Sequence, residues 1–189
     1  MLMHIALHVK NMKKINVVLF EPEIAENCGN IIRSCVGFNA KLHLIFPLGF
    51  NLYDKRVKRA CVNYFDNLEY ETYDNLDDFY SKNKNANIYY LTRYGHKNPS
   101  ELDLKNVDGE VFFMFGKEST GIPYDVLKNN LDKCFRIPTT DKVRALNISN
   151  CVAIVLYKAT EELGFEGLYT HEPDSLKGEF FIDNYQIEK

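Results

Sequence analysis

The sequence has no apolar run that approaches the roughly 18 residues of a membrane-spanning helix, so we expect no membrane segment. It also has no C-x-x-C pair, although it contains five cysteines. Scattered thiols in an odd number are typical of a reducing compartment, which favours a cytoplasmic protein with free and mostly buried cysteines. These absences exclude a membrane protein and a small secreted domain held by disulfides.

Three motifs of common enzyme classes are also missing. The spacing Gly116-x-x-x-x-Gly121 is that of a phosphate-binding loop, but Ile122 and Pro123 follow where such a loop requires Lys and then Ser or Thr. No G-x-G-x-x-G follows the first apolar run, and no G-x-S-x-G occurs anywhere in the chain. These gaps argue against a nucleotide triphosphatase, a dinucleotide-binding enzyme and a serine hydrolase.

Two clusters of titratable residues have simple explanations. His4 and His8 have the spacing of two ligands on a helix, but they lack the Glu of H-E-x-x-H and a nearby third ligand, so we predict no metal site. The acidic residues Glu21, Glu23 and Glu26 are more simply interpreted as a solvated turn than as a general acid–base pair.

Positive charge is concentrated in one short segment. The net charge of −3 argues against indiscriminate binding of nucleic acid but leaves a local patch open. The segment DKRVKRA, residues 54–60, places Lys55, Arg56, Lys58 and Arg59 within five positions. On a helix, these cations could follow the phosphates of a nucleic acid. A solvated helix face is the alternative for an isolated charge run.

Short apolar runs alternate with helical patterns along the chain, which predicts an α/β fold with a mostly parallel sheet and helices on both faces. The predicted strands are residues 15–20, 42–46, 68–73, 87–91, 111–115 and 134–137. The predicted helices are residues 27–38, 54–64, 75–83, 123–130 and 147–163. We expect one domain over residues 15–167, an N-terminal extension over residues 1–14 and a C-terminal tail over residues 168–189.

The last predicted helix is apolar almost all round in its first three turns. Asn147 and Ser149 are suitable caps for its N-terminus. A helix without a polar face is buried on every side. In a chain of only 189 residues, a second subunit would be a natural partner to cover the remaining apolar side of this helix, so we expect a homodimer.

Three polar loops follow predicted strands at the edge where α/β sheets hold their ligands. The first contains EPEI at residues 21–24 and NCGNIIR at residues 27–33. The second is FGKESTGIP at residues 115–123, and the third contains RIP at residues 136–138 and RALNISN at residues 144–150. In content, order and spacing the three loops resemble the motifs of the SPOUT (SpoU/TrmD) methyltransferases.

The residues FEPEI and DKRVKRA resemble one group in particular, the TrmL/YibK enzymes. That resemblance implies a transferase that depends on S-adenosylmethionine (SAM) and methylates the 2′-hydroxyl of the wobble nucleotide, cytidine or modified uridine, in tRNAs of the leucine type. The expected substrate region is the anticodon stem-loop, and no metal is implied.

The resemblance also implies a C-terminal trefoil knot that holds SAM. The matching positions for the cofactor are Leu91, Gly116, Ile137, Ala145 and Leu146. Gly116 would permit close approach of the backbone to SAM, and the apolar side chains would wall the adenine. Relatives often have Ser where this chain has Ala145, a change worth about 1 kcal/mol if the hydroxyl makes a hydrogen bond.

For catalysis the resemblance implicates Arg33, which would bind the 2′-hydroxyl and the neighbouring phosphate beside the other subunit's cofactor. RNA binding is assigned to the basic segment, with Lys55, Arg56, Lys58 and Arg59, and to Arg144 and Tyr157. Two alternatives stay open. One is an enzyme of the same fold that methylates another RNA. The other is an RNA- or nucleotide-binding module that has lost turnover, for which Ala145 is the one sequence hint.

Overall fold

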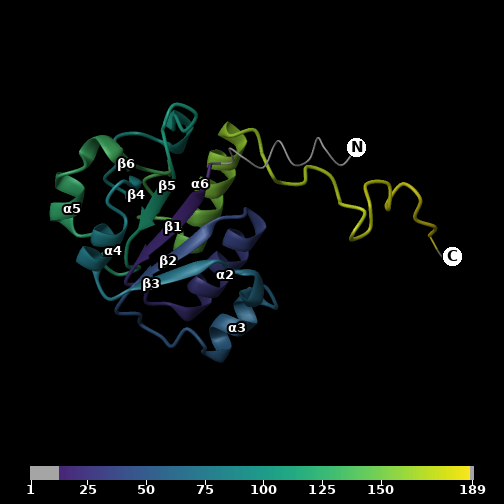
Figure 1. The fold of residues 1–189 in the computed structure, drawn as a ribbon, viewed down its shortest axis with the longest axis horizontal. Coiled ribbons are helices and arrows are strands. Elements are labelled where there is room, and N and C mark those ends of the chain that lie inside the picture. Colours follow the sequence, from purple (N-terminus) through teal and green to yellow (C-terminus); the bar gives the residue numbers. More distant parts are fainter. Residues whose placement is uncertain (1–12, 188–189) are drawn as a thin grey trace.

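A computed structural model describes residues 13–187 and contains a sheet of six strands, all paired in parallel (Figure 1). The strand order is β3-β2-β1-β5-β4-β6, so the chain starts in the middle and fills one side before the other. The strands are β1 (Ile15–Phe20), β2 (Lys41–Ile45), β3 (Tyr70–Tyr73), β4 (Asn87–Leu91), β5 (Val111–Phe115) and β6 (Cys134–Phe135). The predicted parallel six-stranded α/β sheet is confirmed.

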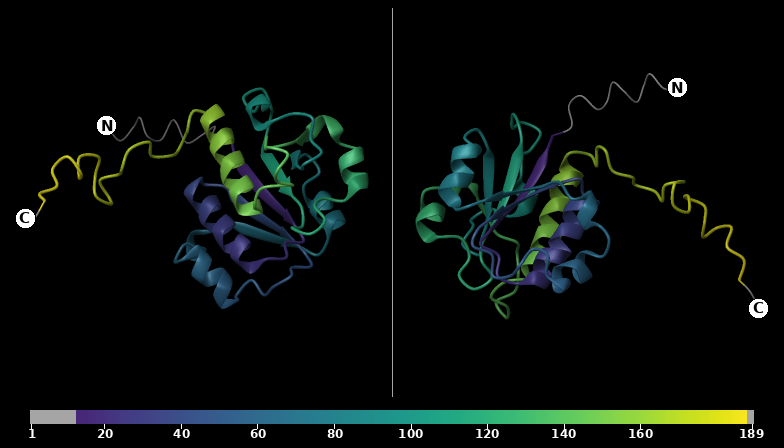
Figure 2. Two further views of the ribbon diagram at one scale, coloured as in Figure 1. Left: turned by 180° about the vertical axis from the view of Figure 1, so that it is seen from behind. Right: turned by 60° about the horizontal axis from the view of Figure 1, so that its bottom comes forward.

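Helices cover both faces of the sheet, as Figure 2 shows. One face carries α2 (Ala25–Gly37), α3 (Lys55–Cys61) and α6 (Ile148–Glu162). The other face carries α4 (Leu76–Lys82) and α5 (Tyr124–Lys128). The 3-10 turns η2 (Phe65–Asn67), η3 (Pro99–Glu101) and η4 (Leu131–Lys133) lie in the connections.

The central strands divide their side chains between two cores. In β1, Val17 and Leu19 pack into the core under α2 and α6, whereas Val18 and Phe20 pack into the core under α4 and α5. All four side chains are buried. A strand buried on both faces has no polar alternation, which is why β1 and β5 are continuous apolar runs in the sequence.

The elements around the basic helix are shorter than predicted. The helix expected over residues 54–64 ends at Cys61, because Val62 has a left-handed backbone with φ of +56°. The strand expected from residue 68 begins at Tyr70, after η2. The basic helix α3 lies directly on α2, where a Cβ atom at Gly29 would come within 2.5 Å of the Ala60 Cβ. Gly29 therefore permits these two helices to approach closely.

The α6 helix confirms its predicted cap and shows an uncovered apolar side. The Asn147 side chain accepts a hydrogen bond from the Ser149 N–H, so Asn147 is the N-cap. Val152, Val155 and Leu156 are buried in the core. Ile154 and Tyr157 are 38% and 49% exposed. In a single chain, α6 thus has an apolar side that no other described element covers fully.

Residues 168–187 contain turns but neither helix nor strand, and they extend away from the body (Figures 1 and 2). Of the predicted N-terminal extension, Lys13 and Lys14 are described, and the Lys14 ammonium pairs with the Glu69 carboxylate at 2.8 Å. The histidine pair His4 and His8 lies outside the described residues. No helix among residues 13–187 has the length and hydropathy needed to cross a bilayer.

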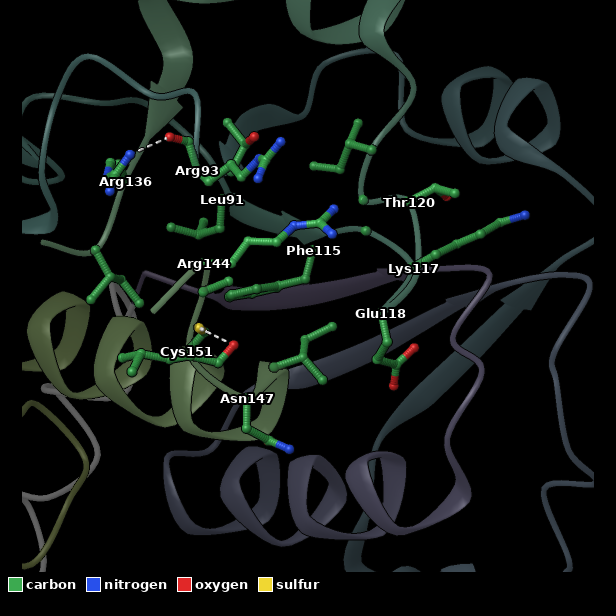
Figure 3. Close-up of a pocket in the computed structure, with 18 of the residues that line it drawn as sticks. Leu91, Arg93, Phe115, Lys117, Glu118, Thr120, Arg136, Arg144, Asn147 and Cys151 are labelled. Carbon is green, nitrogen blue, oxygen red and sulfur yellow. Dashed lines mark hydrogen bonds between the residues drawn. The ribbon is translucent and has the colours of Figure 1, made fainter. Parts of the chain in front are cut away.

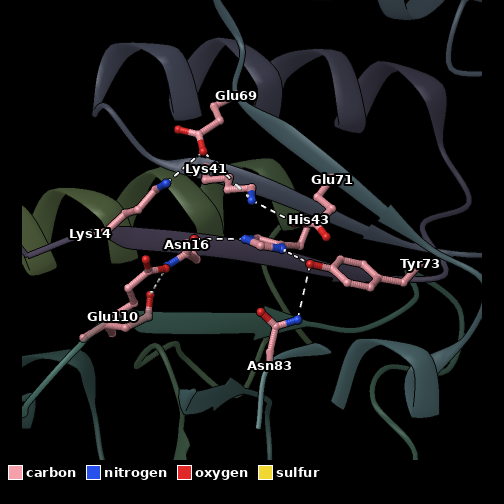
Figure 4. Close-up of polar contacts among 10 residues, drawn as sticks. Lys14, Asn16, Lys41, His43, Glu69, Glu71, Tyr73, Asn83 and Glu110 are labelled. Atoms are coloured by element: carbon pink, nitrogen blue, oxygen red, sulfur yellow. Dashed lines mark hydrogen bonds and ion pairs between the residues drawn. The ribbon is translucent and has the colours of Figure 1, made fainter. Parts of the chain in front are cut away.

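A buried histidine links three strands through hydrogen bonds (Figure 4). The His43 Nδ1 lies 2.7 Å from the Tyr73 hydroxyl, and its Nε2 lies 2.9 Å from the Asn16 Oδ1. Asn16 also donates to the Glu110 carboxylate at 3.1 Å. Burial is the main cause that lowers the pKa of His43 from 6.5 to about 4, so the ring is neutral in the folded protein at pH 7.

The neutral state of His43 predicts a specific acid sensitivity. As the pH falls from about 6.5 to about 4, the unfolded chain takes up a proton on this residue that the folded chain does not. The free energy of unfolding should decrease by up to roughly 3 kcal/mol over this interval. In His43→Gln, which keeps a polar side chain but cannot titrate, this part of the decrease should disappear. Urea unfolding at pH 7 and pH 4.5 measures it, and parallel pH curves for the two proteins would contradict it.

Candidate functional site

A cavity of about 460 Å³ opens at the carboxyl ends of β4, β5 and β6 (Figure 3). This edge of the sheet is where parallel α/β folds bind their ligands. All five positions that the sequence analysis assigned to the cofactor line the cavity: Leu91, Gly116, Ile137, Ala145 and Leu146. The structure therefore brings together residues that are up to 55 positions apart in the chain, since they follow three different strands.

The loop after β4 passes unusually close to the chain that leaves β6. The Thr92 N–H donates to the Phe135 carbonyl at 2.9 Å, and the Arg136 N–H donates to the Lys97 carbonyl at 2.7 Å. Between these bonds, a Cβ atom at Gly95 would lie 2.4 Å from the Phe135 carbonyl carbon. Only glycine fits there, so the crossing of the two segments depends on Gly95.

The loop after β5 closes on itself through its backbone. Lys117 and Gly121 exchange hydrogen bonds of 3.2 and 2.9 Å between their N–H and carbonyl groups. A Cβ atom at Gly116 would lie 2.1 Å from the Gly121 carbonyl carbon, and Gly121 itself has φ of +80°. The tight turn alone is thus a sufficient reason for Gly116, independent of the approach to a cofactor that the sequence analysis expected.

Two carboxylates join this loop to the start of α2. Glu118 accepts hydrogen bonds from the Glu23 N–H at 2.8 Å and from the Asn27 amide at 2.9 Å. Glu23 in turn accepts from the N–H and the hydroxyl of Ser119, both at 2.8 Å. The hydroxyl and then the N–H of Ser119 lower the pKa of Glu23. Asn27 also accepts from the Asn147 amide at 2.9 Å, which connects the third loop to the same network.

Glu23 and Glu26 are exposed, as expected for a solvated turn, but Glu21 and Glu23 also have partners in the second loop. Glu23 bonds to Ser119, and Glu21 forms an ion pair with Lys117. The Lys117 ammonium also lies 5.7 Å from the centroid of the Phe20 ring. Glu26 is exposed and fits the original interpretation. Sequence spacing could not reveal these contacts, because their partners are almost 100 positions away.

The cavity offers both apolar surface and hydrogen-bond donors, which a nucleoside with a polar tail requires. Leu91, Phe115, Ile137 and Leu146 supply apolar surface. In the same lining, the backbone N–H groups of Ile137, Thr139, Arg144, Ala145 and Leu146 donate to no backbone carbonyl within residues 13–187. Such free donors can bond to the edge of an adenine and to a ribose. The residues present therefore fit SAM.

Three arginines surround the cavity: Arg93, Arg136 and Arg144 (Figure 3). None of them forms an ion pair with another described residue. Arg136 donates a hydrogen bond to the Arg93 carbonyl at 2.8 Å. The sequence analysis identified only Arg144. Arg93 and Arg136 follow β4 and β6 closely, and that position at the strand ends was the signal that could have found them.

Arg33 lies elsewhere, outside the cavity of its own chain. It is exposed on α2, and its guanidinium carbon lies 5.6 Å from the centroid of the Tyr64 ring, just beyond α3. Lys55, Lys58 and Arg59 are exposed on α3, which packs against α2, the helix that carries Arg33.

Two other residues predicted to bind RNA, Arg56 and Tyr157, have partners within their own chain. Arg56 is paired with Asp54 at 2.9 Å, so its charge is partly compensated. Tyr157 packs against Phe165, with 5.5 Å between ring centroids, and lines a separate cavity near the end of α2.

No group of three or more His, Cys, Asp or Glu side chains in residues 13–187 is arranged to hold a metal ion. Cys28, Cys35, Cys61 and Cys134 are buried and Cys151 is partly buried, and all five are free, as predicted. Burial is the main cause that raises the pKa of Cys28 to about 12, which makes this thiol a packing residue rather than a nucleophile.

The Glu118 network predicts a measurable loss of stability on mutation. In Glu118→Gln, an amide replaces an acceptor that serves two N–H donors, and at least one charge-assisted bond is lost. The free energy of unfolding should fall by about 1.5–3 kcal/mol, and SAM affinity should fall with it because the second loop loses its anchor. Urea unfolding and calorimetry measure both. Glu166→Gln, an exposed carboxylate with no described partner, should change neither quantity.

Known proteins are similar to this chain over most of its length. The SpoU rRNA Methylase family profile matches residues 14–157. A protein of Geobacillus stearothermophilus named as a tRNA (cytidine(34)-2′-O)-methyltransferase is 46% identical over 154 residues, covering 82% of this chain and 98% of the relative. A protein of the same name from Listeria monocytogenes is 45% identical over 159 residues, covering 84% and 94%.

Solved structures show the same fold. A crystal structure described as an RNA methyltransferase from Bacillus anthracis has a TM-score of 0.76 and 44% identity, and the match covers 82% of this chain and 97% of that one. A structure described as concerning 2-OH methylation of C/U34 on tRNA has a TM-score of 0.74 and 29% identity, with coverage of 81% and 98%. The chain thus belongs to the SpoU methylase family, as its three loop motifs predicted.

Proposed function

We propose that this protein is a SAM-dependent tRNA methyltransferase that acts on the 2′-hydroxyl of the wobble nucleotide. The observation that carries the proposal is the convergence of Leu91, Gly116, Ile137, Ala145 and Leu146 on one cavity. Relatives that match nearly their whole length to this chain are named for the same reaction. We expect the enzyme to act in the cytoplasm on the anticodon stem-loop of tRNAs of the leucine type.

The cofactor would occupy the cavity between the three loops. Leu91, Ile137 and Leu146 would line the adenine site, and the N–H groups of Thr139, Arg144 and Ala145 would bond to its edge and to the ribose. When bound, SAM supplies a methyl group on a sulfonium. The neutral thioether that remains after transfer is a good leaving group. A structure of a distant relative, AviRb from Streptomyces viridochromogenes, is described as a complex with AdoMet.

A trefoil knot over the C-terminal part of residues 15–167, the methyltransferase domain, is part of the proposal. The close crossing at Gly95 supports it, because the chain leaving β6 lies against the loop after β4 before it returns over the cavity to α6. Knotted topologies are rare, so the family membership carries most of this assignment.

The proposed enzyme is a homodimer in which Arg33 acts on the partner's cavity. Two observations support this arrangement. Arg33 does not line the cavity of its own chain, and α6 leaves Ile154 and Tyr157 exposed although the helix is otherwise apolar. A symmetric partner that covers α6 would remove this apolar surface from water.

Arg33 is assigned to stabilise charge rather than to remove a proton. A guanidinium stays protonated at any pH at which the protein is folded. It can therefore hold the 2′-hydroxyl and a neighbouring phosphate in line with the methyl group, and it can stabilise the alkoxide as the hydroxyl proton passes to water. The new O–CH3 bond then forms as the bond between the methyl group and sulfur breaks, which would release S-adenosylhomocysteine. Correct positioning by itself can supply several kcal/mol of barrier reduction, up to about 7–11 kcal/mol in favourable cases.

Mass spectrometry of tRNA nucleosides tests the proposed reaction. Unmodified tRNA incubated with the enzyme and SAM should gain a 2′-O-methylated nucleoside at the wobble position. Methylation at another position or in another RNA would favour the same-fold alternative. SAM binding without any transfer would favour the module that has lost turnover, the alternative suggested by Ala145.

Replacement of Arg33 with Ala should abolish methyl transfer. SAM affinity should stay within about twofold of wild type, because Arg33 is assigned to the 2′-hydroxyl and the phosphate of the RNA and not to the cofactor. A tritiated-methyl assay and calorimetry measure the two quantities, and Arg33→Lys is the matched variant that keeps the charge but not the planar fork. Turnover near the wild-type rate in Arg33→Ala would remove this residue from the mechanism.

Mixed dimers test whether Arg33 acts across subunits. Ala145→Arg should fill the cavity and abolish SAM binding, since Ala145 is exposed at its wall. Equal amounts of Arg33→Ala and Ala145→Arg chains, refolded together, should recover about a quarter of the wild-type activity, because half of the dimers are mixed and each has one complete site. No recovery would place Arg33 in the site of its own chain.

Reversing the charges of Lys55, Lys58 and Arg59 to Glu should weaken tRNA binding and reduce its salt dependence. Three lost phosphate contacts should lower the slope of log K against log salt by roughly 2–3. Filter binding at several salt concentrations measures this slope. The matched control reverses three exposed lysines elsewhere: Lys84, Lys105 and Lys133. An unchanged slope in the α3 variant would make this helix an ordinary solvated surface.

A further inference from the structure

Two exposed tyrosines form an aromatic corner at the edge of the cavity. Tyr94, in the loop after β4, is 43% exposed, and Tyr124, at the start of α5, is 66% exposed. Their ring centroids are 5.7 Å apart and the rings meet at 83°, with 3.3 Å between the two hydroxyls. A planar group stacked on either ring would therefore meet the other ring edge-on.

Arg93 holds this corner in place from one side. Its guanidinium donates a hydrogen bond to the Tyr94 hydroxyl, and its central carbon lies 4.7 Å from the centroid of the Tyr94 ring. The hydrogen bond with Tyr124 and then the one from Arg93 lower the pKa of Tyr94. The hydroxyls are thus engaged with each other and with an arginine, which fixes the ring orientation and leaves ring surface toward solvent.

The surroundings of the corner are cationic although the chain as a whole has a net charge of −3. Arg93, Arg136 and Arg144 all border the cavity and form no ion pair with another described residue. Exposed aromatic rings beside unpaired arginines are the combination that binds single-stranded nucleic acid, since rings stack on bases and guanidinium groups hold phosphates.

We propose that Tyr94 and Tyr124 stack against one unpaired nucleobase of the RNA substrate, while Arg93 and its neighbour Arg136 bind the adjoining phosphate. This inference rests on the proposed function. It adds a stacking contact with a base of the RNA, made by the same chain that holds the cofactor. A base of the substrate loop that is unstacked in the complex would recover part of its stacking energy on this corner.

The placement of the corner favours a base over the cofactor as its occupant. Tyr94 lines the cavity, but Tyr124 does not, so the ring with the larger exposed fraction lies outside the space assigned to SAM. The apolar surface of Leu91, Ile137 and Leu146 already suffices for one adenine.

The absence of tryptophan provides a direct test. Tyr124→Trp introduces the chain's one indole at the corner, so all indole fluorescence comes from this position. An unmodified anticodon stem-loop RNA with C34 should quench this emission at saturation. The same hairpin with a single abasic nucleotide at the stacked loop position should bind but quench much less. Equal quenching by hairpins made abasic at each loop position in turn would overturn the stacking.

A second set of variants separates this inference from the proposed reaction. Tyr124→Leu and Tyr94→Leu should each weaken binding of the hairpin by roughly tenfold, whereas Tyr124→Phe should bind within about threefold of wild type because it keeps the ring. The affinity for S-adenosylhomocysteine should be unchanged in Tyr124→Leu and Tyr124→Phe, because Tyr124 does not line the cavity. Tyr185→Leu is the control, since that tyrosine is 61% exposed in the tail, away from the cavity.

The outcomes separate the base-stacking role from the proposed reaction. Hairpin binding by the Leu variants equal to that of wild type would overturn the base-stacking role, even if the wild-type enzyme methylates tRNA. A loss of S-adenosylhomocysteine affinity with RNA binding intact would assign the corner to the cofactor and likewise overturn it. Failure of the wild-type enzyme to methylate any tRNA, with quenching still dependent on one base, would refute the proposed reaction but support the corner as an RNA site.

Discussion

The Glu118 carboxylate is the interaction on which the site depends. The sheet can fix where its strands end, but it cannot fix the loops beyond them. Glu118 binds the start of α2 through the Glu23 N–H and Asn27, and Asn27 extends the same network to Asn147 at the start of α6. One acceptor group therefore holds the second loop against the first and, through an amide, against the third.

Glycines allow these loops to come close enough for the network to form. At Gly95 the loop after β4 lies against the chain leaving β6, and at Gly116 a tight turn folds back on Gly121. Both contacts are between backbones, so a side chain cannot move aside to make room. Hydrogen bonds to carboxylates and the close backbone contacts thus support each other, and the cavity of about 460 Å³ is the space that they enclose.

The residues proposed to bind SAM and those proposed to act on RNA lie on two surfaces that a single chain does not join. The cavity and the arginines around it lie at the edge formed by β4, β5 and β6, whereas Arg33 and the basic helix α3 lie on the face covered by α2. A dimer that places α2 of one subunit near the cavity of the other would bring the substrate hydroxyl, the methyl donor and Arg33 together. The exposed side of α6 is the apolar surface available for such contact.

The amino-acid sequence by itself determined the α/β class, the strand positions of β1 and β5, the cap of α6 at Asn147 and five residues that line one cavity. These features depend on local patterns: buried strands are continuous apolar runs, a cap lies beside its helix, and each loop motif is contiguous. Element ends were less predictable, as at Val62, because a left-handed residue has no clear signal when it is not glycine.

The tertiary structure alone decided which distant groups meet. The pairing of Glu23 with Ser119, the network around His43 and the corner of Tyr94 and Tyr124 join residues 27 or more positions apart. Nothing in the neighbourhood of Glu23 indicates that its carboxylate has a partner, and nothing beside Tyr124 indicates a second ring. Such contacts arise from the order β3-β2-β1-β5-β4-β6, which brings strand ends together regardless of their separation along the chain.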